Sequence, residues 1–122
     1  MKAYRFDLVV FFTQPPLAGA QGKEALDTAL VSATFEQKTA LVFTGSGVLQ
    51  LLKNQQPDLL ELKGIQAMLK ALPLYDLDAI YVDQESMERL QLTSEQLLLD
   101  IDVLPADQIR QLMSTSKNLL VF

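Results

Sequence analysis

The residue types that perform most protein chemistry are scarce in this sequence. Its 122 residues include no cysteine and no histidine. Without a thiol, the chain cannot form a persulfide, a disulfide or a thiolate nucleophile. Zinc sites built from Cys and His are excluded for the same reason, and the commonest general base is missing. Any chemistry would therefore have to come from carboxylates, hydroxyls or backbone groups.

Aspartates are the main remaining candidates for chemistry. Five of them flank two expected strands: Asp76, Asp78, Asp83, Asp100 and Asp102. Receiver domains cluster aspartates at strand ends to hold Mg²⁺, and oxygen ligands of this kind suit that ion. Such a site needs adjacent acids directly after the first strand, where this chain has Thr13 and Gln14 instead. We therefore expect the aspartates to be solvated and expect no metal site.

A glycine-containing turn is the main candidate for ligand binding. Thr44-Gly45-Ser46-Gly47 follows an expected strand and precedes a short helix, which is where α/β proteins place anion-binding turns. The turn lacks the third glycine of a dinucleotide fingerprint and the lysine of a phosphate loop. We favour a structural turn in which glycine adopts a positive φ. The loop from Gln14 to Gly22, which follows the first expected strand, is likewise interpreted as structural.

Two apolar stretches are candidates for protein–protein contact. Leu74-Tyr75-Asp76 joins an apolar residue, an aromatic ring and a charge at an element boundary, and tyrosine in that setting often anchors an interface. The alternative is a strand entry that packs onto its own core. The second stretch is the short helix that carries Val48, Leu49, Leu51 and Leu52, which is too apolar for a fully solvated surface.

Two kinds of element alternate along the chain and would position these residues. Continuous apolar runs predict strands of a parallel sheet, and apolar residues at helical spacing predict helices. The expected strands are Tyr4–Phe12, Ala40–Phe43, Leu77–Val82, Asp100–Val103 and Asn118–Phe122, and the expected helices are Gly22–Phe35, Val48–Lys53, Leu62–Leu72, Gln84–Leu90 and Pro105–Ser114. This order predicts an α/β fold, a three-layer sandwich with a mostly parallel sheet of about five strands. The length fits a single domain over residues 1–122.

Charge and hydropathy restrict the partners and the compartment. The formal net charge is −5, and the ten basic residues are scattered along the chain. Proteins that grip a phosphate backbone gather Lys and Arg on one face, so we expect no direct nucleic-acid binding. No apolar run approaches the roughly 18 residues of a membrane helix, and no signal peptide is apparent. We therefore expect a cytoplasmic protein with no cofactor.

Several segments together resemble a known family. They are Gly22–Asp27 at the first helix, Gly47–Leu52 after the second strand, Gln55-Gln56-Pro57-Asp58, Leu74-Tyr75-Asp76 and a final strand that ends at Phe122. In this order and spacing the chain resembles the TusC/DsrF subfamily of the DsrE/DsrF/DsrH sulfur-relay family. The resemblance covers nearly the whole chain and implies a DsrE-like fold of flavodoxin-like appearance.

The resemblance also implies a function. TusC-like proteins assemble with TusB-like and TusD-like subunits into a dimer of heterotrimers, which relays persulfide sulfur toward 2-thiolation of the wobble uridine of certain tRNAs. DsrF-type relatives serve a similar complex in sulfur oxidation. The relay cysteine of the active subunit lies near the end of the third strand, a region occupied here by Val82-Asp83-Gln84. The resemblance thus implies a non-catalytic subunit rather than an enzyme.

Two other functions stay open at this point. One is a small-ligand or nucleotide-binding module that uses the turn at Gly45 and Gly47. The other is a stand-alone enzyme built on carboxylates. Co-purification of two small partner proteins would favour the relay subunit, whereas a bound nucleotide or flavin would favour the ligand-binding module.

Overall fold

A parallel sheet forms the centre of the molecule. The computed structural model describes residues 5–15, 21–53 and 60–122. Within these residues, five strands pair in the order β4-β3-β2-β1-β5, and every neighbouring pair is parallel. The strands are β1 (Phe6–Phe12), β2 (Thr39–Phe43), β3 (Ile80–Asp83), β4 (Asp102–Leu104) and β5 (Ser116–Val121). The expected α/β architecture is confirmed, and the sheet is parallel throughout.

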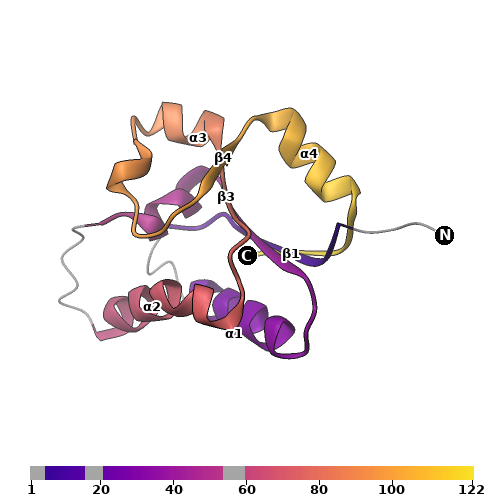
Figure 1. Ribbon diagram of the computed structural model, residues 1–122. Coiled ribbons are helices and arrows are strands. Elements are labelled where there is room, and N and C mark those ends of the chain that lie inside the picture. Colours follow the sequence, from indigo (N-terminus) through magenta and orange to yellow (C-terminus); the bar gives the residue numbers. More distant parts are fainter. Residues whose placement is uncertain (1–4, 16–20, 54–59) are drawn as a thin grey trace.

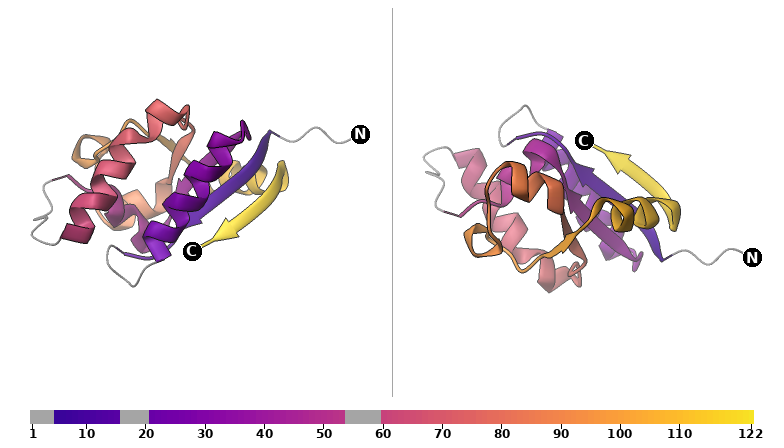
Figure 2. Two further views of the ribbon diagram at one scale, coloured as in Figure 1. Left: turned by 90° about the horizontal axis from the view of Figure 1, so that it is seen from below. Right: turned by 90° about the horizontal axis from the view of Figure 1, so that it is seen from above.

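Helices cover both faces of this sheet. In Figure 1, α1 (Gln21–Thr34) and α2 (Leu60–Ala71) lie on one face, whereas α4 (Ala106–Ser114) lies on the other. The two views in Figure 2 show the same division. Four shorter helices lie in the connections between strands: the 3₁₀ helices η1 (Gly45–Leu51), η2 (Leu72–Tyr75) and η3 (Ser94–Gln96), and α3 (Gln84–Arg89). No helix within the described ranges is long and apolar enough to cross a membrane.

The direction of the chain explains why α4 lies on the face opposite α1 and α2. From β1 to β4 the strands are added in one direction across the sheet, and the chain then returns past β1 to place β5 on the opposite edge. Parallel crossovers are almost always right-handed. A crossover that runs in the reverse direction must therefore pass over the opposite face, which is where α4 lies.

The continuous apolar run of β1 is buried on both faces. Leu8, Val10 and Phe12 belong to the larger core cluster beneath α1 and α2. Val9 and Phe11 point the opposite way, into a smaller cluster with Leu112 of α4. Side chains alternate between the two faces of a strand, so a strand covered on both sides is apolar at every position.

Several element boundaries differ from the predicted ones. The short helix after β2 is a 3₁₀ helix that begins at Gly45 rather than an α-helix from Val48. β3 begins at Ile80 rather than Leu77, because Asp76 adopts a left-handed conformation and the Ile80 amide donates to the Asp78 carbonyl. β4 covers Asp102–Leu104, two residues later than expected at its start, and β5 begins two residues earlier, at Ser116. Tyr4, most of the loop before Gly22 and the segment 54–58 lie outside the described residues.

Candidate functional site

Polar side chains meet where β2 and β3 end. Thr44 follows β2 directly, and Asp83 is the last residue of β3. Because these strands are parallel neighbours, their carboxyl ends reach the same edge of the sheet. The Thr44 hydroxyl donates a hydrogen bond to Asp83 Oδ2 at 3.2 Å. Open α/β sheets bind ligands outside the carboxyl ends of their strands, so this edge is the candidate functional site.

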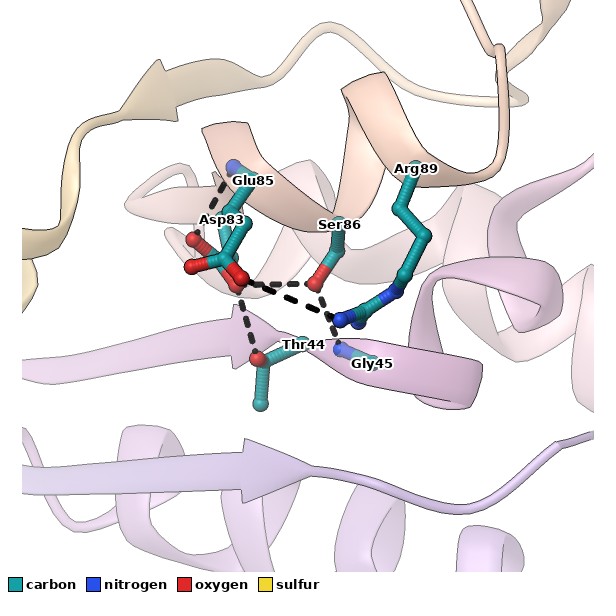
Figure 3. A network of polar contacts seen from close by, with 6 residues as sticks. All are labelled: Thr44, Gly45, Asp83, Glu85, Ser86 and Arg89. Carbon is teal, nitrogen blue, oxygen red and sulfur yellow. Dashed lines mark hydrogen bonds and ion pairs between the residues drawn. The ribbon is translucent and has the colours of Figure 1, made fainter.

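Asp83 is the centre of the hydrogen-bond network at this edge (Figure 3). Its Oδ2 also accepts a hydrogen bond from the Ser86 hydroxyl at 2.8 Å, and its Oδ1 accepts one from the Glu85 amide at 3.3 Å. The latter contact makes Asp83 the N-cap of α3. The Ser86 oxygen in turn accepts a hydrogen bond from the Gly45 amide at 2.8 Å. The network therefore joins the start of η1 to the start of α3.

The Ser86 hydroxyl in this network serves a structural purpose. Ser86 is completely buried, and its proton is directed to Asp83. A carboxylate beside a hydroxyl is an arrangement that activates nucleophiles, but a nucleophile must also reach its substrate. Ser86 has no access to a substrate because of its burial. The ion pair between Arg89 and Glu85, at 3.9 Å, is exposed, and exposed pairs of this kind contribute little to stability.

A small cavity adjoins the network. It is open to solvent and has a volume of about 190 Å³, with Phe11 of β1 and Ile109 of α4 as apolar walls and with Thr44, Asp83 and Arg110 as polar lining. Ligand pockets for nucleotides and other drug-sized molecules usually measure about 300–1,000 Å³. The space beside Asp83 is thus large enough for a few atoms of a partner side chain rather than for a nucleotide.

The glycine turn has a structural explanation at both glycines. Gly45 has a φ of +57°, a value that favours glycine, and its amide is bound to Ser86. The Gly47 amide donates to the Thr44 carbonyl at 3.0 Å, and a Cβ at Gly47 would lie 1.9 Å from the Phe12 carbonyl oxygen. Both amides are therefore committed within the protein, which favours the structural interpretation over anion binding.

The other aspartates do not converge on Asp83. Asp76 and Asp78 precede β3, and Asp102 is the first residue of β4, so these groups lie near the amino ends of their strands. Within the described residues, no group of three or more Asp and Glu side chains is placed to hold a metal ion. The aspartates expected from the sequence are thus divided between the amino ends and the carboxyl ends of the strands.

The two predicted contact surfaces have different outcomes. Leu74 and Tyr75 of η2 are 84% and 50% exposed, so this stretch does not pack onto its own core. Together with Asp76, Tyr75 lines a cavity of about 360 Å³ at the amino edge of the sheet, and the opposite wall comes from the end of α1. In the helix after β2, Val48 and Leu51 are completely buried in the core, whereas Leu49 and Leu52 are half-buried. A contact role for this helix stays a prediction, and it can involve only the half-buried positions.

Comparison with known proteins places the chain in a family. The DsrE/DsrF-like family matches residues 7–122, which is nearly the whole sequence. The chain belongs to the DsrE/DsrF-like family. The curated protein named "Protein TusC homolog" from Vibrio vulnificus strain CMCP6 is 34% identical to it over 115 residues, covering 94% of this chain and 98% of that protein. A protein of the same name from Pseudomonas aeruginosa PAO1 is 35% identical over 106 residues, covering 87% of this chain and 89% of that protein.

A solved structure supports the same fold. The ychN protein from Escherichia coli aligns with a TM-score of 0.81 over 100% of both chains, although the sequences are only 16% identical. The predicted DsrE-like fold is confirmed, as is the resemblance to TusC-type members of the DsrE/DsrF-like family. That Asp83 occupies the region of the relatives' relay cysteine stays a prediction.

Ser86 was not among the site residues predicted from the sequence. Its burial and its contacts with both Asp83 and Gly45 make it as central to the network as Asp83. The available signal was the Asp-x-x-Ser spacing, which places a hydroxyl in the first turn of a helix that an aspartate caps.

Replacing Asp83 with alanine should destabilise the domain without unfolding it. The change removes the N-cap of α3 and leaves Ser86 buried without its acceptor, so we expect a loss of about 2 kcal/mol in the free energy of unfolding. Urea denaturation followed by circular dichroism would measure it. Asp78→Ala is the matched control, because this exposed aspartate should change stability by less than about 0.5 kcal/mol. Equal effects of the two substitutions would contradict the central role of Asp83.

Proposed function

We propose that this chain is the non-catalytic subunit of a TusBCD-like sulfur-relay complex. In that role it would support the transfer of persulfide sulfur toward 2-thiolation of the tRNA wobble uridine. The observation that carries this proposal is the combination of curated relatives named TusC homolog with a sequence that has no cysteine. Sulfane sulfur is carried on a thiolate, so the relay thiols must belong to other subunits.

The chemistry of the candidate site agrees with a supporting role. The end of β3 carries the Asp83 carboxylate, which already accepts hydrogen bonds from Thr44, Ser86 and the Glu85 amide. A carboxylate cannot hold a sulfane sulfur. The adjoining cavity of about 190 Å³ would accept a side chain from another subunit more readily than a separate substrate.

The proposed docking surface is the stretch Leu74-Tyr75-Asp76. Leu74 exposes most of its side chain to solvent, and the Tyr75 ring is half exposed beside the cavity at the amino edge of the sheet. Aromatic side chains with an apolar ring and a polar tip are frequent anchors of protein interfaces. TusB-like and TusD-like subunits are the partners that we propose for this surface.

Co-expression with TusB-like and TusD-like proteins tests the proposal. We expect one complex whose mass corresponds to a dimer of heterotrimers in light scattering. When a cysteine desulfurase supplies labelled sulfur, the label should be retained on a thiol-bearing subunit and never on this chain. A chain that stays separate from both partners, or that itself retains covalent label, would refute the proposed function.

The double substitution Tyr75→Ala with Asp76→Lys should weaken this association. Loss of an aromatic anchor typically costs about 2 kcal/mol or more of binding free energy, which corresponds to at least about a 30-fold weaker complex. Association would be measured by titration with the partner subunits, and the fold by circular dichroism. Met113→Ala with Asp27→Lys removes an exposed apolar side chain and reverses an exposed charge elsewhere, and it should leave the affinity unchanged. Equal affinities for both double variants would show that the docking surface lies elsewhere.

A further inference from the structure

The second half of the edge strand β5, Leu119–Val121, has the side-chain pattern of an interior strand. Within the described residues it pairs only with β1. Leu119 and Val121 lie beside Val9 and Phe11 on the face that α4 covers, whereas Leu120 lies beside Val10 on the opposite face. These side chains are nevertheless 39%, 67% and 39% exposed, respectively. The second half of β5 is thus apolar on both faces although it forms the border of the sheet.

Natural edge strands are usually protected against further pairing. Charged side chains, proline or a bulge commonly interrupt the exposed edge. The only charged residue of β5 is Lys117, near its start, and the four residues from Leu119 to Phe122 are all apolar. The second half of this edge therefore lacks the usual protection.

The backbone of β5 presents regularly spaced hydrogen-bonding groups at the border. The Phe122 amide donates to the Phe11 carbonyl at 2.9 Å, and its carbonyl accepts from the Thr13 amide at 2.8 Å. Phe122 therefore directs both backbone groups toward the β1 side. Because successive residues of a strand alternate in direction, Val121, Leu119 and Lys117 direct their amides and carbonyls outward.

We propose that this edge pairs antiparallel with β5 of a second copy of the chain, about a two-fold axis that passes beside Leu119. Two copies related by a two-fold axis can join identical strands only in the antiparallel direction. The pairing joins the two sheets into one continuous sheet. It covers the apolar side chains of β5 and satisfies the outward backbone groups.

For pairing with a second copy, hydrogen bonding and charge both favour this register over its neighbours. With Leu119 opposite Leu119 of the second copy, Lys117 faces Val121, and all three outward residues of each strand exchange hydrogen bonds, about six in total. A shift by one pairing step in either direction leaves one outward residue of each strand unpaired. The register also keeps the two lysines apart, whereas like charges directly opposite each other destabilise a sheet.

Paired charge substitutions at Val121 test the register. Val121→Lys places a lysine opposite Lys117 of the second copy, so we expect the dimer to weaken by at least tenfold. Val121→Glu is equally polar but places opposite charges together, and its dimer should persist. Adding Lys117→Glu to Val121→Lys should restore the dimer. Analytical ultracentrifugation of the full chain measures each equilibrium, and circular dichroism verifies the fold. A monomeric wild-type chain, or equal weakening by lysine and glutamate, would overturn the proposal.

A single engineered cysteine supplies a second, covalent test. The sequence has no native thiol, so Leu119→Cys would be the only one. Directly opposed residues of an antiparallel pair have Cα atoms about 4.5–5.5 Å apart, within the range that a disulfide bridges. Mild oxidation should give a covalent dimer with Leu119→Cys and not with Val31→Cys, an exposed position on α1. Equal cross-linking of both variants, or of neither, would overturn the pairing.

This pairing concerns the chain by itself and does not depend on the proposed function. If Leu119→Cys fails to cross-link but the chain forms a stable complex with TusB-like and TusD-like subunits, only the proposed β5 pairing is refuted. If the chain forms the β5 dimer but does not associate with those subunits, only the proposed relay function is refuted. The two proposals are therefore tested separately.

Discussion

Replacing Gly47 with alanine is expected to destabilise the protein by about 3 kcal/mol or more, because the new methyl group has no space. A Cβ at this position would lie 1.9 Å from the Phe12 carbonyl oxygen and 2.5 Å from its carbon. These are backbone atoms at the end of a central strand, so they cannot rotate away. To relieve the contact, η1 would have to move off β1 and would take Thr44 and Gly45 of the candidate site with it.

Two other glycines provide matched controls for the Gly47 substitution. Gly45 has free space around its Cβ position but a φ of +57°, so Gly45→Ala should cost about 1–2 kcal/mol through backbone strain alone. Gly64 lies within α2 with nothing nearby, so Gly64→Ala should stabilise the protein by about 0.5–1 kcal/mol. Urea denaturation of the three variants would measure the order. A Gly47→Ala protein as stable as the Gly45→Ala protein would show that η1 adapts without cost.

The substitution Phe43→Ala should have a similarly large effect through loss of packing. Phe43 is completely buried, and its ring stacks on that of Phe12 with centroids 4.4 Å apart and planes inclined by 14°. Removing a buried phenylalanine side chain typically costs about 3–5 kcal/mol, since a cavity remains where the ring was. A domain of ordinary stability has only about 5–15 kcal/mol in total. The variant should therefore unfold at much lower urea concentrations.

Phe35→Ala is the control for Phe43→Ala because it removes the same side chain from the surface. Phe35 lies just beyond α1 and is 74% exposed, so its loss should change the free energy of unfolding by less than about 0.5 kcal/mol. Thermal and urea denaturation would compare the two variants. Similar midpoints for both would contradict the placement of the Phe12–Phe43 pair within the larger core cluster.

The sequence predicted the members of the candidate site better than their contacts. Asp83 was placed at the end of the third strand and Thr44 after the second, and both positions are confirmed. Their hydrogen bond depends on β2 and β3 being neighbours in the sheet, which no local pattern specifies. Ser86 escaped attention because a serine in the first turn of a helix is common. Its role becomes clear only from its burial and from its bond to the Gly45 amide.

Composition and periodicity alone determined the chemistry that this chain cannot perform and the class of its fold. The absence of cysteine excludes a persulfide on this chain in any conformation, and the alternation of apolar runs predicts an α/β sheet because burial follows side-chain periodicity. Only the tertiary structure decided which surfaces are free. The run Leu119–Val121 has the pattern of an interior strand, yet β5 lies at the border because the chain returns past β1 after β4. Leu74 and Val48 were equally apolar candidates, but η2 exposes the first and η1 buries the second. A local pattern records how apolar a segment is, whereas long-range packing determines what covers it.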